Sequence, residues 1–212
     1  LWHAVALRLQ IAFVNATFAT TLGALAALAM VRFGRFRGRT LFGGMLVAPL
    51  VMPEVITGLS LLVLFISLKE VIGWPAERGF TTITIAHITF SLAFVAVTVQ
   101  ARLTGIRRDY EEAARSLGAS PVQTFFQVTF PLMLPAVFAG ALFAFTISFD
   151  NITATIFWRP SGMETVPTQI FGMLRNSVSP EINALGFVMI CITVGVPLVA
   201  GALARYFSRK KI

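Results

Sequence analysis

The sequence has few charged residues and a single cysteine. Only 12% of its 212 residues are charged, and Cys191 is alone. One cysteine excludes a disulfide framework and a metal site made of several thiolates. No GxxxxGK[ST] loop occurs, so we expect no P-loop for ATP and no cofactor bound by this chain itself. The two histidines, His3 and His87, lie far apart and form no pair of catalytic groups, which disfavours an enzyme.

Apolar residues, by contrast, are abundant. They make up 57% of the chain, with 20 Phe among them, and the mean hydropathy is +0.82. This composition is typical of a protein whose partner is membrane lipid. The net charge of +8 suggests nucleic acid at first sight. The basic residues lie in short loops between apolar segments, however, so orientation in a membrane explains them better and we expect no nucleic-acid partner.

Five apolar segments are long enough to cross a bilayer, which takes about 20 residues each. They span residues 9–31, 41–68, 80–101, 131–157 and 184–207. Residues 1–8 are interpreted as a short polar lead-in. The sequence therefore predicts an all-α polytopic membrane protein with one transmembrane domain over residues 1–212.

The basic residues predict which ends of the spans share a side. Segments 32–40 and 102–130 and the C-terminal segment each carry four Lys or Arg, which is 12 of the 17 in the chain. Short loops rich in Lys and Arg stay in the cytoplasm. We therefore expect these three segments, including the C-terminus, to be cytoplasmic.

A polar stretch at 109–135 interrupts the apolar segments. Its first half places four apolar residues on one face of a short helix: Tyr110, Ala113, Ala114 and Leu117. Gly118 then follows, as Gly commonly does just beyond a helix C-terminus.

A second short helix is predicted to begin after that glycine. Ser120 is its expected N-cap, with Pro121 at the first helical position and Gln123 completing a capping box. Two short capped helices between membrane spans indicate a docking element for another protein. The alternative is purely structural, because Asp109 and Glu112 also fit a capping box, and Glu112 would then only cap its own helix.

The same stretch resembles the EAA motif of ABC importer permeases. The resemblance rests on Glu112, Ala113 and Ala114, then Gly118, and finally the Phe-Pro pair at 130–131. In that family the loop is a coupling helix, seated in a groove of the ATP-binding subunit. The resemblance thus implies that ATPase coupling involves a set of five residues: Glu112, Ala113, Ala114, Leu117 and Gly118. It also implies that ATP-Mg is bound by the ATPase partner and not by this chain.

This resemblance carries further expectations about fold and partners. It implies a type I (MetI-like) permease domain in the bacterial inner membrane, with coupling helices at 109–130. The implied partners are ABC ATPase subunits, a second permease chain and a periplasmic solute-binding protein. Such permeases usually have six spans with both ends inside, and this chain begins at Leu1 without Met. We therefore expect a sixth, N-terminal span that is missing from the five seen here.

Acidic residues occur inside two predicted spans, where burying a charge is costly and usually serves a pathway. Glu54 follows Pro53, and Asp150 precedes Asn151 near the end of the fourth segment. The rise of a helix places both acids in the outer half of the membrane. With no basic residue predicted inside the spans, Glu54, Asp150 and Asn151 indicate a pathway for a cation.

Each acid also has a structural alternative. Asp150 could pair with Arg159 or Arg175, and Glu54 could be protonated and serve no substrate.

Four segments extend the resemblance to the second permease of spermidine/putrescine importers: residues 53–65, 86–99, 148–157 and 179–186. The resemblance implies a polyamine as the cationic solute. That family often carries a second acid where Asn151 stands. The wider group also includes permeases for other organic solutes and for ferric iron. From another class, a passive channel or membrane scaffold would share the spans but would not need the Glu112 loop.

Overall fold

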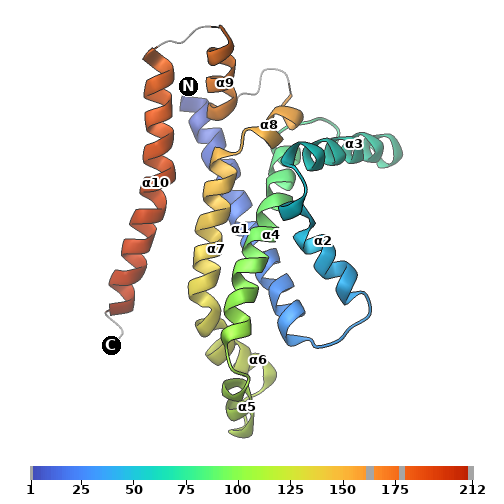
Figure 1. Ribbon diagram of the computed structural model, residues 1–212, viewed down its shortest axis with the longest axis vertical. Coiled ribbons are helices and arrows are strands. Elements are labelled where there is room, and N and C mark those ends of the chain that lie inside the picture. Colours follow the sequence, from blue (N-terminus) through green and yellow to red (C-terminus); the bar gives the residue numbers. More distant parts are fainter. Residues whose placement is uncertain (1, 161–164, 177–179, 210–212) are drawn as a thin grey trace.

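The computed structural model describes residues 2–160, 165–176 and 180–209, and all regular elements among them are helices (Figure 1). In chain order they are α1 (Trp2–Arg32), α2 (Arg39–Val51), α3 (Glu54–Ile72), α4 (Phe80–Gly105), α5 (Asp109–Ser116), α6 (Pro121–Thr124), the π-helical turn η1 (Phe125–Thr129), α7 (Phe130–Asp150), α8 (Thr153–Trp158), α9 (Val166–Asn176) and α10 (Pro180–Arg209). Within this described part, five helical runs are long and apolar enough to cross a membrane. The predicted all-α polytopic fold is confirmed.

The centre of the bundle is formed by α1, α4 and α7, which run side by side in Figure 1. Gly23 of α1 allows the close approach of α4, because a Cβ there would lie only 2.8 Å from Val95 Cβ. A buried polar contact adds specificity to this apolar packing. Asn15 Nδ2 donates to Ser91 Oγ at 3.0 Å and to the Ala144 carbonyl at 2.9 Å, so one side chain joins all three helices.

The predicted span 41–68 is wrong as a single helix. It is divided into α2 and α3 at Met52, whose backbone is extended with ψ 138. The cause is Pro53, since proline disfavours the helical conformation in the residue before it and cannot donate a backbone hydrogen bond. Figure 1 shows α2 rising beside the bundle and α3 projecting sideways from it near the upper end of α4. The predicted span 131–157 is likewise divided, because α7 ends at Asp150 and α8 begins at Thr153.

The predicted polar lead-in at residues 1–8 is also wrong. Helix α1 already begins at Trp2, and Arg8 is fully buried in the bundle, with 0% exposure. The expectation that the spans contain no basic residue therefore fails. Arg8 is tolerated there because its N–H groups are satisfied by partners on α7 and α8, which are distant in sequence.

Different segments gather at the two ends of the bundle (Figure 1). The loop 33–38, helices α5 and α6 and the C-terminal end of α10 lie towards one end, while α3, α8 and α9 lie at the other. The segments predicted to share a side thus share an end of the molecule. Their placement in the cytoplasm remains a prediction.

Candidate functional site

The three predicted pathway residues meet at one cavity. Glu54 is the first residue of α3, Asp150 is the last residue of α7, and Asn151 follows it. All three line a cavity of about 360 Å³. Asn151 Nδ2 lies 3.5 Å from Glu54 Oε2, within hydrogen-bonding distance. Residues separated by almost a hundred positions therefore form one acidic pocket, which we call the Glu54–Asp150 pocket.

Two helix breaks create this pocket. The break before Pro53 turns α3 towards α8, and the break after Asp150 lets α8 fold back against α3. Trp158 fastens the two helices together, because its buried indole Nε1 donates to the Gly58 carbonyl at 3.0 Å. A continuous helix through 41–68 would not bring Glu54 to α7 in this way.

The pairing of Asp150 with Arg159 or Arg175 remains a prediction. The described residues form two ion pairs, Arg32–Glu111 and Arg107–Asp109, and neither involves Asp150. The side chain of Arg175 lies outside the described residues.

Beside the pocket lies a buried polar cluster around Arg8, whose burial the sequence did not predict. Arg8 Nε donates to the Phe149 carbonyl at 2.8 Å, and its two terminal nitrogens donate to Thr155 Oγ1, at 2.9 Å, and to the Asn151 carbonyl. His87 on α4 extends the cluster. We call Arg8, His87, Ser148 and Thr155 the Arg8 bracket.

Within the Arg8 bracket, His87 links α4 to α7 and α8. His87 Nδ1 lies 2.8 Å from Ser148 Oγ, and its Nε2 lies 3.1 Å from Thr155 Oγ1. Both contacts are to hydroxyls of other helices, so His87 holds α4 to α7 and α8. Hydropathy alone gives no signal for the bracket, because the partners of Arg8 are more than 140 positions away.

At the opposite end of the bundle α5 forms as predicted, and α6 begins at the predicted position but continues through η1 into α7. Gly118 has φ +88, a left-handed conformation that glycine adopts without strain, and it ends α5. The capping box of α6 is present. Gln123 N donates to Ser120 Oγ at 3.2 Å, and Ser120 N donates to Gln123 Oε1 at 2.8 Å.

The apolar face of α5 points away from the rest of the chain. Tyr110 is 56% exposed and Leu117 is 90% exposed. Ala113 is exposed and Ala114 is half-buried between them. A helix that leaves its apolar face uncovered is available to another molecule.

The alternative role of Glu112 as a helix cap is wrong. The N-cap position belongs to Arg108 and makes no side-chain cap. Asp109 already lies inside the helix and pairs with Arg107. Glu112 itself is exposed, so its carboxylate is accessible to a partner.

The neighbouring Glu111 was not predicted to have a role, yet it is the buried residue of α5, with 8% exposure. Its Oε1 accepts from Arg32 Nε at 2.9 Å and from Thr129 Oγ1 at 2.9 Å. One carboxylate thus joins the end of α1 to α5 and to η1. No signal within 109–135 identifies the partner Arg32, which is 79 positions away.

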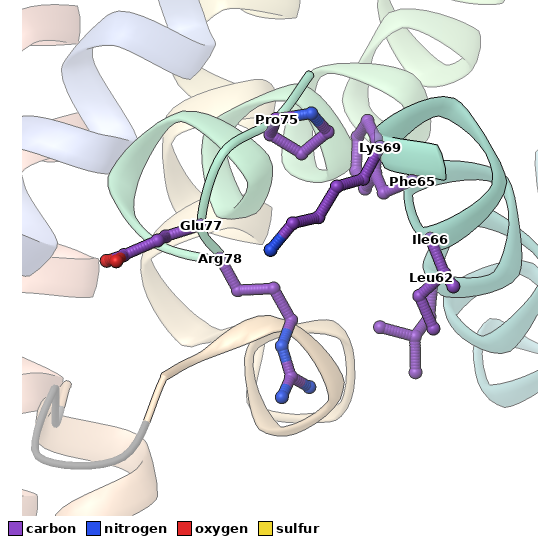
Figure 2. A pocket seen from close by; sticks show the side chains of 7 residues that line it. All are labelled: Leu62, Phe65, Ile66, Lys69, Pro75, Glu77 and Arg78. Atoms are coloured by element: carbon purple, nitrogen blue, oxygen red, sulfur yellow. The ribbon is translucent and has the colours of Figure 1, made fainter. Parts of the chain in front are cut away.

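A second cavity of about 220 Å³ lies between α3 and the loop 73–79. Figure 2 shows Lys69 and Arg78 directed towards it, while the carboxylate of Glu77 points away from both. This cavity is basic where the Glu54–Asp150 pocket is acidic. Of the two, only the Glu54–Asp150 pocket is suited to a cation.

The fold is that of the membrane-spanning subunit of an ABC importer. The structure superimposes on a subunit of the methionine ABC transporter MetNI with a TM-score of 0.76 at 18% identity, covering 97% of this chain and 95% of that one. A bacterial alginate ABC transporter gives a TM-score of 0.79 at 16% identity, covering 96% of this chain and 78% of that one.

The chain belongs to the family described as "Binding-protein-dependent transport system inner membrane component", whose model matches residues 19–212. It is 48% identical over 207 residues to the putrescine transport system permease protein PotI of Escherichia coli K12, covering 98% of this chain and 72% of that protein. It is 38% identical over 197 residues to the spermidine/putrescine permease PotC of the same organism, covering 93% and 72%.

These findings confirm that the chain is the permease subunit of an ABC importer in the inner membrane, and not the ATP-hydrolysing subunit. Importer permeases of this fold work with ATPase subunits and a periplasmic binding protein, and the alginate transporter has been solved with its periplasmic protein bound.

Proposed function

We propose that this permease forms, together with a second permease chain, the translocation path for a polyamine, with a putrescine-like diamine as its preferred substrate. The observation that carries the proposal is the convergence of Glu54, Asp150 and Asn151 on one cavity. The relatives named as putrescine and spermidine/putrescine permeases support the same substrate class.

The chemistry of the pocket matches an alkyl diamine. Two carboxylates attract a cation and accept hydrogen bonds from its ammonium groups. The apolar side chains of Ile147 and Ile152 also line the cavity and can pack against the methylenes between the charges. A simple metal cation would leave these apolar walls unused.

The proposal assigns the opposite end of the molecule to energy coupling. ATPase subunits, which bind ATP-Mg, dock on the exposed face of α5, and contacts there are made by five residues: Glu112, Ala113, Ala114, Leu117 and Gly118. A solute-binding protein delivers the polyamine at the end formed by α3, α8 and α9. Closure of the ATPases moves the two short helices and switches the path between inward- and outward-facing states.

Uptake by the complete complex in reconstituted vesicles tests the substrate. We expect putrescine and spermidine to compete with a labelled diamine, and K⁺ not to compete. Asp150→Asn and Glu54→Gln should each raise the KM for the diamine about tenfold or more, the change expected from losing one charge-assisted hydrogen bond. Assembly with the ATPase should stay normal in both variants.

Glu77→Gln is the matched control, because Glu77 is an exposed carboxylate at the basic cavity. It should leave the KM unchanged. Unchanged kinetics in Asp150→Asn would remove Asp150 from the pathway, and a wild-type complex that transports no polyamine would refute the proposed substrate.

A further inference from the structure

A buried, positively charged side chain, that of Arg8, lies behind the wall of the Glu54–Asp150 pocket. Arg8 is fully buried, and it does not line the cavity. Its three hydrogen bonds go to the carbonyls of Phe149 and Asn151 and to the hydroxyl of Thr155. These groups flank Asp150 on both sides along the chain, so Arg8 holds the backbone that carries the acid.

This arrangement follows from the break between α7 and α8. The last carbonyls of a helix have no partner within it, and a cation is favourable at this negative end of the helix dipole. A guanidinium fits because its planar fork donates several hydrogen bonds in fixed directions. Thr155 strengthens the junction, since it accepts from Arg8 and donates to the Asn151 carbonyl at 3.1 Å.

Arg8 acts on Asp150 through charge as well as through the backbone. No ion pair joins the two side chains in the part of the chain that the structure describes, yet the guanidinium bonds the carbonyls of Phe149 and Asn151, on either side of the acid, and so brings its positive charge close to Asp150. The Asp150 carboxylate therefore remains on the pocket wall while a nearby positive charge offsets it. Counted with both carboxylates ionised, Glu54, Asp150 and Arg8 give the region a formal charge of −1.

We propose that Arg8 is a specificity-determining residue, which positions Asp150 and Asn151 through the backbone and limits the negative charge of the pocket, so that a diamine is preferred to a triamine. The inference rests on the proposed function. A third ammonium group gains less from a pocket whose charge is partly cancelled, and it is repelled by the guanidinium.

The test separates charge from positioning in the reconstituted complex, with KM and kcat measured for labelled putrescine and spermidine. Arg8→Gln removes the charge and should lower the KM of spermidine relative to that of putrescine by about tenfold. Arg8→Lys keeps the charge but cannot reproduce the fork, so it should preserve that ratio and raise both KM values. Asn151→Asp adds a negative charge without touching the bracket, and should shift the ratio in the same direction as Arg8→Gln.

An unchanged KM ratio in an assembled Arg8→Gln complex would overturn the proposal. If the Arg8→Gln complex does not assemble, the Arg8→Lys and Thr155→Val variants test the proposal in its place. Both should raise the putrescine KM with kcat changed less than about twofold, and Thr155→Ser should restore it. Normal KM values in both would likewise overturn the proposal.

Thr98→Val is the matched control, because the Thr98 hydroxyl donates to Phe94 O within α4, away from the bracket. It should leave both KM values unchanged. Failure of the proposed function would look different from failure of this inference: the wild-type complex would then transport neither amine, whatever the variants do.

Discussion

Two adjacent glutamates on α5 have opposite surroundings, and this difference yields a prediction at the scale of single residues. Glu111 is buried and bonded to Arg32 and Thr129, whereas Glu112 is exposed. Glu111→Gln should lower the stability of the permease by about 2 kcal/mol, because it leaves the half-buried Arg32 without its ion-pair partner. Thermal unfolding of the purified permease in lipid nanodiscs measures this loss.

Glu112→Gln is the control for the same chemical change one residue further on. It should change stability by less than about 0.5 kcal/mol, yet reduce the amount of ATPase that copurifies. If the two variants unfold at the same temperature, the ion pair does not stabilise the junction of α1, α5 and η1.

The residue scale also shows what a sequence can indicate about a site. Glu54 and Asp150 could be selected because a carboxylate within an apolar run is unusual and costly. Arg8 and Glu111 could not, because each is explained by a partner in another helix. The sequence shows where burying a charge would be unfavourable. The contacts that compensate for this burial depend on how the chain folds.

At the scale of helices, the exposed face of α5 predicts a docking surface of small residues. Ala114→Trp should abolish association with the ATPase, because the added indole occupies the space of the partner's groove. Membrane insertion and thermal stability should not change, since Ala114 packs only partly against its own chain. Copurification of the ATPase with the permease measures the effect.

Ser116→Trp provides the matched control on α5, since Ser116 is exposed but lies off the apolar face. It should retain the ATPase. Normal copurification with Ala114→Trp would exclude this face of α5 as the docking surface.

Close packing of α1 against α4 gives a second prediction at this scale. Gly23→Ala should destabilise the bundle by about 1–3 kcal/mol, the usual cost of overpacking, because the new methyl would lie 2.8 Å from Val95 Cβ. Val95→Ala in the same chain should recover only a small part of the loss, because it removes the Cγ1 contact at 2.9 Å but keeps the Cβ and the Leu92 carbonyl at 3.0 Å. Thermal unfolding of the single and double variants measures both effects.

Gly44→Ala on α2 is the control for this substitution, because nothing lies within 4 Å of the added methyl. It should be neutral or slightly stabilising, as Ala favours a helix more than Gly does. Equal destabilisation by both variants would show that contact with Val95 is not the cause.

The positions of most helices could be predicted from the sequence, but the points at which the chain changes direction between them could not. Hydropathy located the apolar segments, and capping residues located α6, because both signals are local. Hydropathy could not distinguish Pro49, which α2 accommodates, from Pro53, before which the helix ends. That difference decides whether Glu54 reaches α7, so the pathway pocket depends on a feature that composition does not reveal.

At the scale of the whole molecule, one helical run connects the two ends. It extends from Pro121 to Asp150, 30 residues, which corresponds to about 45 Å at the rise of an α-helix. Its first residues follow α5 and the turn at Gly118, and its last residue lines the Glu54–Asp150 pocket. Movement of the short helices at one end can therefore reach the pocket through a single element, with the π-helical turn η1 as its irregular part.

The orientation of this run in the membrane gives the final prediction. Because basic loops stay inside, a cysteine placed at Arg37 should face the cytoplasm, and one placed at Arg78, at the other end of the bundle, should face outwards. Cys191, which is exposed on α10, is first replaced by Ala. A membrane-impermeant maleimide added to intact spheroplasts should then label Arg78→Cys at once and label Arg37→Cys only after permeabilisation. The opposite pattern would place α5 and the C-terminus outside, beyond the reach of an ATPase, and would overturn the proposed coupling.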